Sequence, residues 1–185
     1  MALAAGIPPF PEHHLAIAPG RIILRGLIFF PRSHMGDIDW LEWHDGLLTG
    51  HAAIDEEHRT FARLISTLSE VPDVGLLDAL EAALEAARAH FGHEDKVMED
   101  TQFPPRGCHM GEHTAVLASM TAVRARLTRG ETQPARLLAA ELTRWFPAHV
   151  QHLDSALAHW IFKQSVNAKP LVFRRSLGSS IQEAA

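Results

Sequence analysis

The chain has 185 residues, of which 46% are apolar and 21% are charged, and its formal net charge at pH 7 is −5. This composition is typical of one domain that buries a core, and it excludes an intrinsically disordered chain. The mild acidic excess, without a long basic run, argues against binding to nucleic acid or to an anionic membrane surface. The single cysteine, Cys108, excludes an internal disulfide and zinc sites built on cysteine pairs. The absence of disulfides leads us to expect a cytoplasmic protein. We expect Cys108 itself to be a small buried residue.

Histidine is the unusual feature of the composition, with thirteen in the chain and no tyrosine. Imidazoles are mostly neutral at pH 7, so net charge does not require them, whereas metal ligation does. The composition therefore suggests a metal site before any helix is assigned.

The first 35 residues differ from the rest of the chain. Five prolines interrupt them, and their only strongly apolar run, residues 22–30, is too short to insert across a bilayer. That run also lacks the layout of a secretory signal, because Arg21 and Arg25 lie beside or within it instead of ahead of it. We expect residues 1–35 to form a loosely ordered or non-native extension, and we hypothesise that native translation starts at Met35.

From about residue 51 to residue 163, apolar residues recur at spacings of three and four, which predicts four helices. The second of them begins after Asp73, which we expect to be its cap. The residues that break the pattern between helices are Pro72, Pro104, Gly130 and Pro134. Short connections imply antiparallel neighbours, so the predicted fold is all-α, an up-down-up-down antiparallel four-helix bundle. We assign residues 36–163 to this domain and residues 164–185 to a C-terminal tail.

Side chains of the metal-ligand type interrupt the apolar stripe of every predicted helix. His58, for example, lies one turn from both Ile54 and Phe61. The complete set is His58 on the first helix, His90 and Glu94 on the second, His109 and His113 on the third, and His149 and Asp154 on the fourth. Burying an ionisable group without a partner is costly, so five imidazoles and two carboxylates aimed at one core predict a bound cation.

These donors are too many for one tetrahedral zinc ion, whereas imidazole combined with carboxylate suits iron, and helix bundles are known hosts for two irons. The set therefore predicts a dinuclear centre. Its weakest member is the last, because five residues turn by about 140° on an α-helix. Helix geometry would as readily choose His152 or Leu153 as Asp154.

The order of these residues from Trp43 to about Trp160 resembles the hemerythrin family, specifically its bacterial single-domain members. The matching residues are Ile54-Asp55 with His58, His90-Phe91 with Glu94, Met98 and Pro104, the pair His109 and His113, and Trp145 before His149 and Asp154. The resemblance implies that His109, His113 and His149 bind one iron, that His58 and His90 bind the other, and that Glu94 and Asp154 bridge both. The resemblance, and not the spacing, selects Asp154 over His152.

The resemblance also implies roughly octahedral irons joined by an oxo or hydroxo bridge. Five imidazoles, two bridging carboxylates and one bridging oxygen then leave a single position open, on the iron with two histidines. We expect reversible O2 binding there, for oxygen storage, delivery or supply, and no enzymatic activity. Phe146 and Trp145 are the candidate walls of the oxygen pocket.

Two alternatives stay open. One is a di-iron enzyme that reduces peroxide or nitric oxide or oxidises ferrous iron, although the ferritin-like enzymes of that kind use Glu-x-x-His motifs, which this sequence lacks. The other is a module that senses O2 or redox state, which would need a separate partner because no part of the chain resembles a known output domain. We expect O2 as the ligand and leave open an oxygen-consuming or redox partner.

Three further polar or helix-breaking residues lie near the predicted ligands. Glu57 stands where the family often has glutamine, and we interpret it as a solvated carboxylate, with hydrogen bonding to His58 as the alternative. Glu141 is expected to pair with Arg144 instead of orienting an imidazole. Pro147 is expected to kink the last helix and widen the pocket.

Overall fold

The computed structural model of the chain describes Leu41 and residues 43–167. The predicted extension at residues 1–35, the proposed start at Met35 and most of the predicted tail at residues 164–185 therefore lie outside the described residues. Within the described part, every regular element is a helix, and no helix combines the length and the apolarity needed to cross a membrane.

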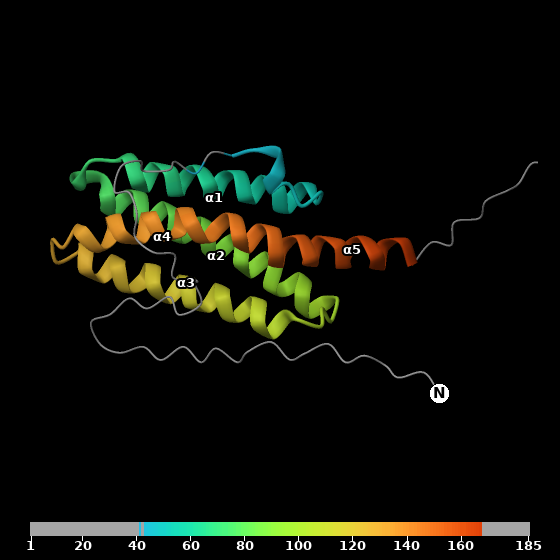
Figure 1. The fold of residues 1–185 in the computed structure, drawn as a ribbon. Coiled ribbons are helices and arrows are strands. Elements are labelled where there is room, and N and C mark those ends of the chain that lie inside the picture. The colour runs from blue at the N-terminus through green and yellow to red at the C-terminus, as the bar shows by residue number, and fades with distance from the viewer. Residues whose placement is uncertain (1–40, 42, 168–185) are drawn as a thin grey trace, which may run out of the picture.

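Helices joined by short turns make up the domain (Figure 1). The elements in chain order are η1 Asp45–Leu47, α1 Ala52–Glu70, η2 Asp73–Gly75, α2 Leu76–Asp100, α3 Arg106–Leu127, α4 Gln133–His149, η3 Val150–Asp154 and α5 Ser155–Asn167. η1 and η2 are single 3-10 turns, whereas η3 is a π-helical turn. α4, η3 and α5 continue in one direction and together form the fourth rod of the bundle (Figure 1).

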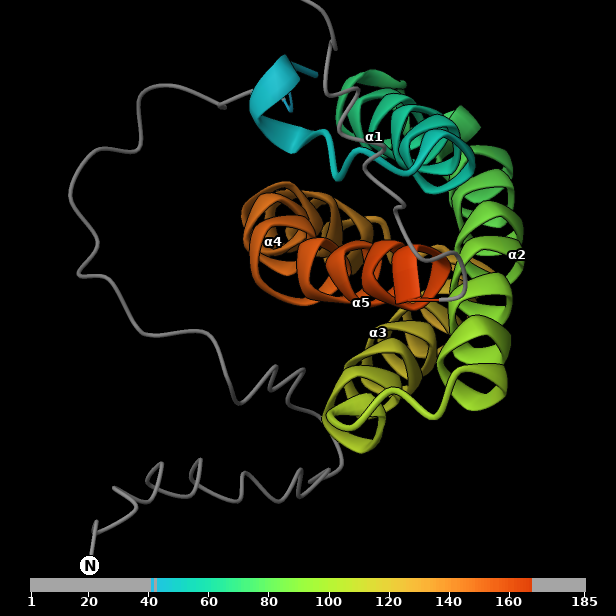
Figure 2. The same ribbon diagram turned by 90° about the vertical axis from the view of Figure 1, so that its right-hand side faces the viewer.

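The four rods form a closed antiparallel arrangement in which α1 and α3 each lie between α2 and α4 (Figure 2). Each helix follows its predecessor back along the bundle, so the predicted all-α, up-down-up-down topology is confirmed. The polar side chains of interest lie between these rods, where every helix presents one face.

The start of α1 is held by a buried carboxylate. Asp55 accepts hydrogen bonds from the backbone N–H groups of Thr49 at 2.7 Å and Gly50 at 3.2 Å, and from the Thr49 hydroxyl at 2.8 Å. Gly50 has a φ of +83°, a conformation that favours glycine. His51 caps the helix by accepting from the N–H of Ile54. These contacts fix the backbone at the start of α1, one turn before His58.

Our expectation that Asp73 caps the second helix is wrong. Asp73 opens the turn η2, and α2 begins after Gly75 without a side-chain cap. The Asp73 carboxylate instead accepts a hydrogen bond at 2.7 Å from Arg136 of α4, which also donates to the carbonyl groups of Ser69 and Val71 at the end of α1. Arg136 thus ties α4 to the connection between α1 and α2, where it occupies the carbonyl groups that a helix end leaves without partners.

A polar layer divides the apolar core into two clusters. Along α2, Phe91 belongs to the larger cluster, Glu94 to the polar layer and Met98 to the smaller cluster. The fourth rod repeats this order with Val150 in the larger cluster, Asp154 in the polar layer and Leu157 in the smaller cluster. Apolar side chains therefore lie on both sides of the ionisable groups along the bundle axis.

Candidate metal centre

All seven side chains predicted to hold metal are buried and converge on the polar layer. They form two groups, and within each group the donor atoms lie within 4.8 Å of one another. The three-histidine group is His109, His113 and His149 with Glu94 and Asp154, and the two-histidine group is His58 and His90 with the same two carboxylates. The two groups therefore share both Glu94 and Asp154.

The three-histidine group has the spacing of ligands around one ion. The Nε2 atoms of His109 and His113 each lie 3.2 Å from Nε2 of His149. Two donors about 2.1 Å from one metal ion and at a right angle to each other lie about 3.0 Å apart. Asp154 Oδ1 lies 2.9 Å from His109 Nε2, and Glu94 Oε2 lies 3.4 Å from His113 Nε2. One ion could contact all five side chains.

The two-histidine group lies on the other side of the same carboxylates. Asp154 Oδ2 is 3.1 Å from His58 Nε2, whereas its Oδ1 faces His109 and His149. Glu94 Oε2 lies 3.8 Å from His90 Nε2. The two oxygens of Asp154 thus face different donor groups, which is the geometry of a bridge between two ions, and Oε2 of Glu94 lies between the two groups.

Eight buried side-chain atoms of the polar layer lack a hydrogen-bond partner among the described residues. They are His58 Nδ1 and Nε2, His90 Nε2, His109 Nδ1, and both carboxylate oxygens of Glu94 and of Asp154. Several of them lie close to one another, but they are not aligned as donor and acceptor. Buried polar atoms nearly always have partners, and leaving one unpaired is costly. Cations between the two groups would satisfy the carboxylate oxygens and the imidazole lone pairs together.

The electrostatics of the layer also favour a cation. Burial and the neighbouring Asp154 carboxylate raise the pKa of Glu94 to about 7. Burial acts in the same direction on Asp154, but the imidazoles of His109, His149 and His58 hold its pKa well below the usual range. Burial lowers the pKa of His149, yet the carboxylates of Asp154 and Glu112 outweigh it and raise that pKa to about 9. Two carboxylates lie side by side in this buried layer, which favours positive charge beside them.

Three of the five imidazoles also contact a carboxylate through Nδ1, on the side away from the layer. Metal-binding histidines commonly donate their second N–H to a carboxylate, which orients the ring and leaves the other nitrogen free to bind. The pairs are His90 with Glu57 at 3.0 Å, His113 with Asp95 at 2.7 Å, and His149 with Glu112 at 3.1 Å. Each pair joins one helix to the next, so the rings are held by the packing of the bundle.

Sequence reasoning missed most of these outer carboxylates. Our interpretation of Glu57 as a solvated carboxylate is wrong, because it contacts His90 and also His93, whose Nδ1 lies 2.9 Å from Glu57 Oε1. Asp95 and Glu112 each stand next to a predicted ligand in the sequence, which is the only local signal they give. Their partners lie on the following helix, and helix periodicity does not specify that contact.

Glu141 has its predicted partner, whereas Cys108 is not where we expect it. Glu141 pairs with Arg144, as predicted. Cys108 is exposed, so the expectation that it is buried is wrong. It lies in the first turn of α3, one residue before His109, and the buried face of the helix takes His109 instead.

The π turn η3 explains how Asp154 reaches the layer. The N–H of Ser155 donates to the carbonyl of Val150, five residues back, and the Ser155 hydroxyl donates to the same carbonyl at 2.9 Å. A π turn takes more residues than an α turn, so five residues return close to the starting face instead of overshooting it by about 140°. Asp154 is buried, whereas His152 is exposed. Pro147, where we expect a kink, lies three residues before this turn.

The two predicted pocket residues lie against different histidine groups. Phe146 is fully buried, and its ring meets that of His58 edge to face with the centroids 5.4 Å apart. The Trp145 ring lies 4.4 Å from that of His149, and its indole N–H donates to Glu112 at 3.1 Å. Only Phe146 therefore adjoins the two-histidine group.

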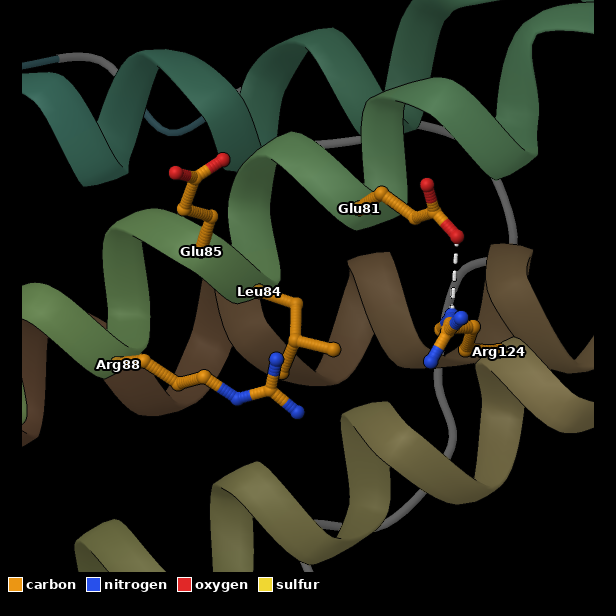
Figure 3. Close-up of a pocket in the computed structure, with 5 residues that line it drawn as sticks. All are labelled: Glu81, Leu84, Glu85, Arg88 and Arg124. Carbon is orange, nitrogen blue, oxygen red and sulfur yellow. Dashed lines mark hydrogen bonds and ion pairs between the residues drawn. The ribbon is translucent and has the colours of Figure 1, made fainter.

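A surface groove between α2 and α3 contains none of these groups (Figure 3). It is lined by Glu81, Leu84, Glu85, Arg88 and Arg124. Arg124 donates to Glu81 at 2.9 Å across it. The candidate metal centre is instead enclosed in the core.

The sequence of the helical bundle is similar to that of known proteins. The family model described as the hemerythrin HHE cation binding domain matches residues 49–161, which include all seven buried donors. A bacteriohemerythrin of Ralstonia nicotianae is 33% identical over 129 residues, which cover 70% of this chain and 94% of that protein. Bacteriohemerythrins of Pseudomonas paraeruginosa and Stenotrophomonas maltophilia are each 25% identical, over 62% and 64% of this chain and 77% and 79% of their own lengths. These similarities and the buried cluster fit a non-haem iron site.

Proposed function

The chain belongs to the hemerythrin family, and from this premise we propose that it binds O2 reversibly at a pair of iron ions in its core. The observation that carries the proposal is the pair of donor groups that share two carboxylates. In this proposal His109, His113 and His149 hold one iron, His58 and His90 hold the other, and Glu94, Asp154 and an oxo or hydroxo bridge join them. The protein would serve oxygen storage, delivery or supply.

When bound, two ferrous ions would supply the electrons that hold O2 at the centre, and the O–O bond would stay intact. The chain's own residues fix where this happens. Glu94 and Asp154 balance positive charge inside an apolar core, and the outer carboxylates keep the ring nitrogens turned inward. The group of His58 and His90 has one imidazole fewer than the other group, so the open position belongs on that side.

The surroundings of His58 favour binding over catalysis. The rings packed against it are those of Phe146, His90 and Trp43, and both His58 and Phe146 are fully buried. A pocket with aromatic walls delivers few protons and little water, which are needed to convert bound O2 into products. We therefore propose a carrier and not an oxidase.

Stopped-flow mixing of the anaerobic diferrous protein with O2 tests this proposal. We expect a coloured complex that persists and that is reversed when O2 is removed under argon. Metal analysis should find about two irons per chain, as expected for a dinuclear bundle site. Prompt decay to the diferric protein, without a reversible phase, would favour the enzyme alternative.

A pair of histidine variants checks that the complex forms at this site. His149→Ala removes a member of the three-histidine group, whereas His152→Ala changes an exposed histidine three residues further along the same rod. We expect only His149→Ala to lose iron and O2 binding. Equal losses in both variants would mean that the effect comes from the helix and not from the centre.

A further inference from the structure

We propose that Trp43 is the outer wall of the oxygen pocket and controls how fast small ligands reach the iron beside His58. This inference rests on the proposed function and adds a residue to it that lies outside the four rods. The Trp43 ring centroid is 6.5 Å from that of His58. Trp43 is half-buried, whereas His58, Phe146 and His90 are buried.

Among the described rings that adjoin His58, Trp43 is the most exposed to solvent. The ring centroids of Phe146 and His90 lie 5.4 Å and 4.7 Å from that of His58. Both of these side chains are buried. Trp43 is the ring beside His58 that touches both the interior and the surface. A small molecule that approaches from this side has to pass the indole.

Trp43 can move without disturbing the bundle, because it precedes α1 and belongs to no helix. The segment around η1 lies alongside α1 in both views of the fold (Figures 1 and 2). Leu47, after Trp43, is fully buried in the larger core cluster, and the carbonyl of Leu41, before Trp43, accepts from the Ser66 hydroxyl at 3.3 Å. The segment is thus anchored on both sides of Trp43. A loop side chain moves much faster than packed helices rearrange.

Among the described residues, the Arg59 side chain contacts the indole as a cation. The Arg59 guanidinium carbon lies 5.4 Å from the centroid of the Trp43 ring, a cation–π contact, and Arg59 also pairs with Glu56 at 2.8 Å. The Arg59 side chain is half-exposed and that of Glu56 is exposed. The outer contact can therefore break and re-form in water, whereas the Phe146 side of the pocket has no such freedom.

The direct test measures how fast azide binds to the diferric protein. Azide is a linear three-atom anion that ligates ferric iron and so reports access to the open position. We expect Trp43→Ala to accelerate azide binding by about tenfold or more, as follows if the native wall is open a tenth of the time or less. Trp43→Phe should give a smaller increase, and autoxidation of the oxygenated form should follow the same order.

Trp160→Phe is the matched control, because Trp160 packs against the smaller cluster at the opposite side of the polar layer. It should leave the azide rate unchanged. An unchanged rate in Trp43→Ala, or an equal acceleration in Trp160→Phe, would overturn the proposal. If Trp43→Ala does not fold, Trp43→Leu keeps an apolar side chain and should still accelerate binding.

A structural readout that does not depend on iron chemistry separates this inference from the proposed function. Crystals of Trp43→Ala under xenon pressure should show xenon between His58, Phe146 and position 43, because xenon occupies dry apolar cavities. The native protein should show less or none there, and equal occupancy in both would contradict the inference. A native protein that forms no reversible O2 complex would end the proposed function, while the azide and xenon results would still decide the role of Trp43.

Discussion

The two histidine groups use the same carboxylates but are supported in different ways. In the three-histidine group, His113 and His149 each contact an outer carboxylate, Asp95 and Glu112, whereas Nδ1 of His109 has no partner among the described residues. In the two-histidine group only His90 has such a partner, Glu57, and both ring nitrogens of His58 lack one among the described residues. The first group is therefore held by charged contacts between helices.

The two groups also pack against different sets of aromatic rings, with Phe91 and Trp145 beside the three-histidine group and Phe146 and Trp43 beside the two-histidine group. His58 packs against Phe146, and Trp43 covers it from the side of the segment before α1. The difference teaches that two donor groups that share both carboxylates can be fixed by different contacts, and it fits the proposal that the open position lies beside His58. Substitutions in either group, or in the carboxylates that both share, test this division.

The largest effect is expected from removing a carboxylate that both groups share. Glu94→Ala should lose both irons, because two cations then face a single bridging carboxylate. Loss of a buried charge partner should also lower the free energy of unfolding by about 3–5 kcal/mol. Metal analysis and chemical denaturation measure the two effects, with the exposed Glu99→Ala as the control on the same helix. Retention of both irons in Glu94→Ala would contradict the bridge assignment.

A smaller and more selective loss is expected from His58→Ala. Only the two-histidine ion loses a donor, so iron content should fall by about half, as expected for one ion of a dinuclear site. O2 binding should be lost completely, because the proposed open position lies on that ion. His90→Ala should behave in the same way. A variant that loses one iron and still binds O2 would place the open position in the other group.

The outer carboxylates should have an intermediate effect on metal affinity. Glu112→Ala leaves the His149 ring without its Nδ1 partner, and losses of this kind typically reduce metal affinity by about 10- to 100-fold. Competition with a chelator measures the affinity. Glu141→Ala is the control, because Glu141 pairs with the exposed Arg144 and not with a histidine of the centre. Equal affinities in the two variants would show that Glu112 does not support the centre.

The smallest effect is expected from Phe146→Leu, which keeps an apolar side chain beside His58. Unfolding should become easier by about 1–1.5 kcal/mol, the usual cost of a change of shape in a core. Iron content should stay unchanged, while the oxygenated form should autoxidise faster because water reaches the pocket more easily. An altered iron content would mean that Phe146 supports the metal and not only the pocket.

Helix periodicity predicted most of the candidate site because its signal is local. His90 and Glu94, and likewise His109 and His113, are four residues apart, so each pair lies on one face of its helix. The buried stripe then determines that the face points inward. Asp154 could not be found in this way, since the π turn changes the number of residues per turn between His149 and Asp154.

Contacts between helices lay beyond the reach of the same signal. Asp95 and Glu112 stand beside predicted ligands, yet their histidine partners lie on the next helix. The axial register and the rotation of neighbouring helices decide such contacts, and neither is encoded in the spacing within one helix. Glu57 was misinterpreted for this reason, because its contact with His90 joins α1 to α2.

The sequence by itself determined the four helices and six of the seven predicted donor residues, because the apolar period and the residue types are local properties. The seventh, Asp154, was selected by the resemblance to a family and not by helix spacing. Only the tertiary structure decided that Asp154 faces both donor groups, which imidazoles have carboxylate partners, and that Trp43 lies beside His58. These facts depend on a π turn and on how four helices and one preceding segment pack together. Packing brings together residues far apart in the chain, and no short-range pattern specifies their distances.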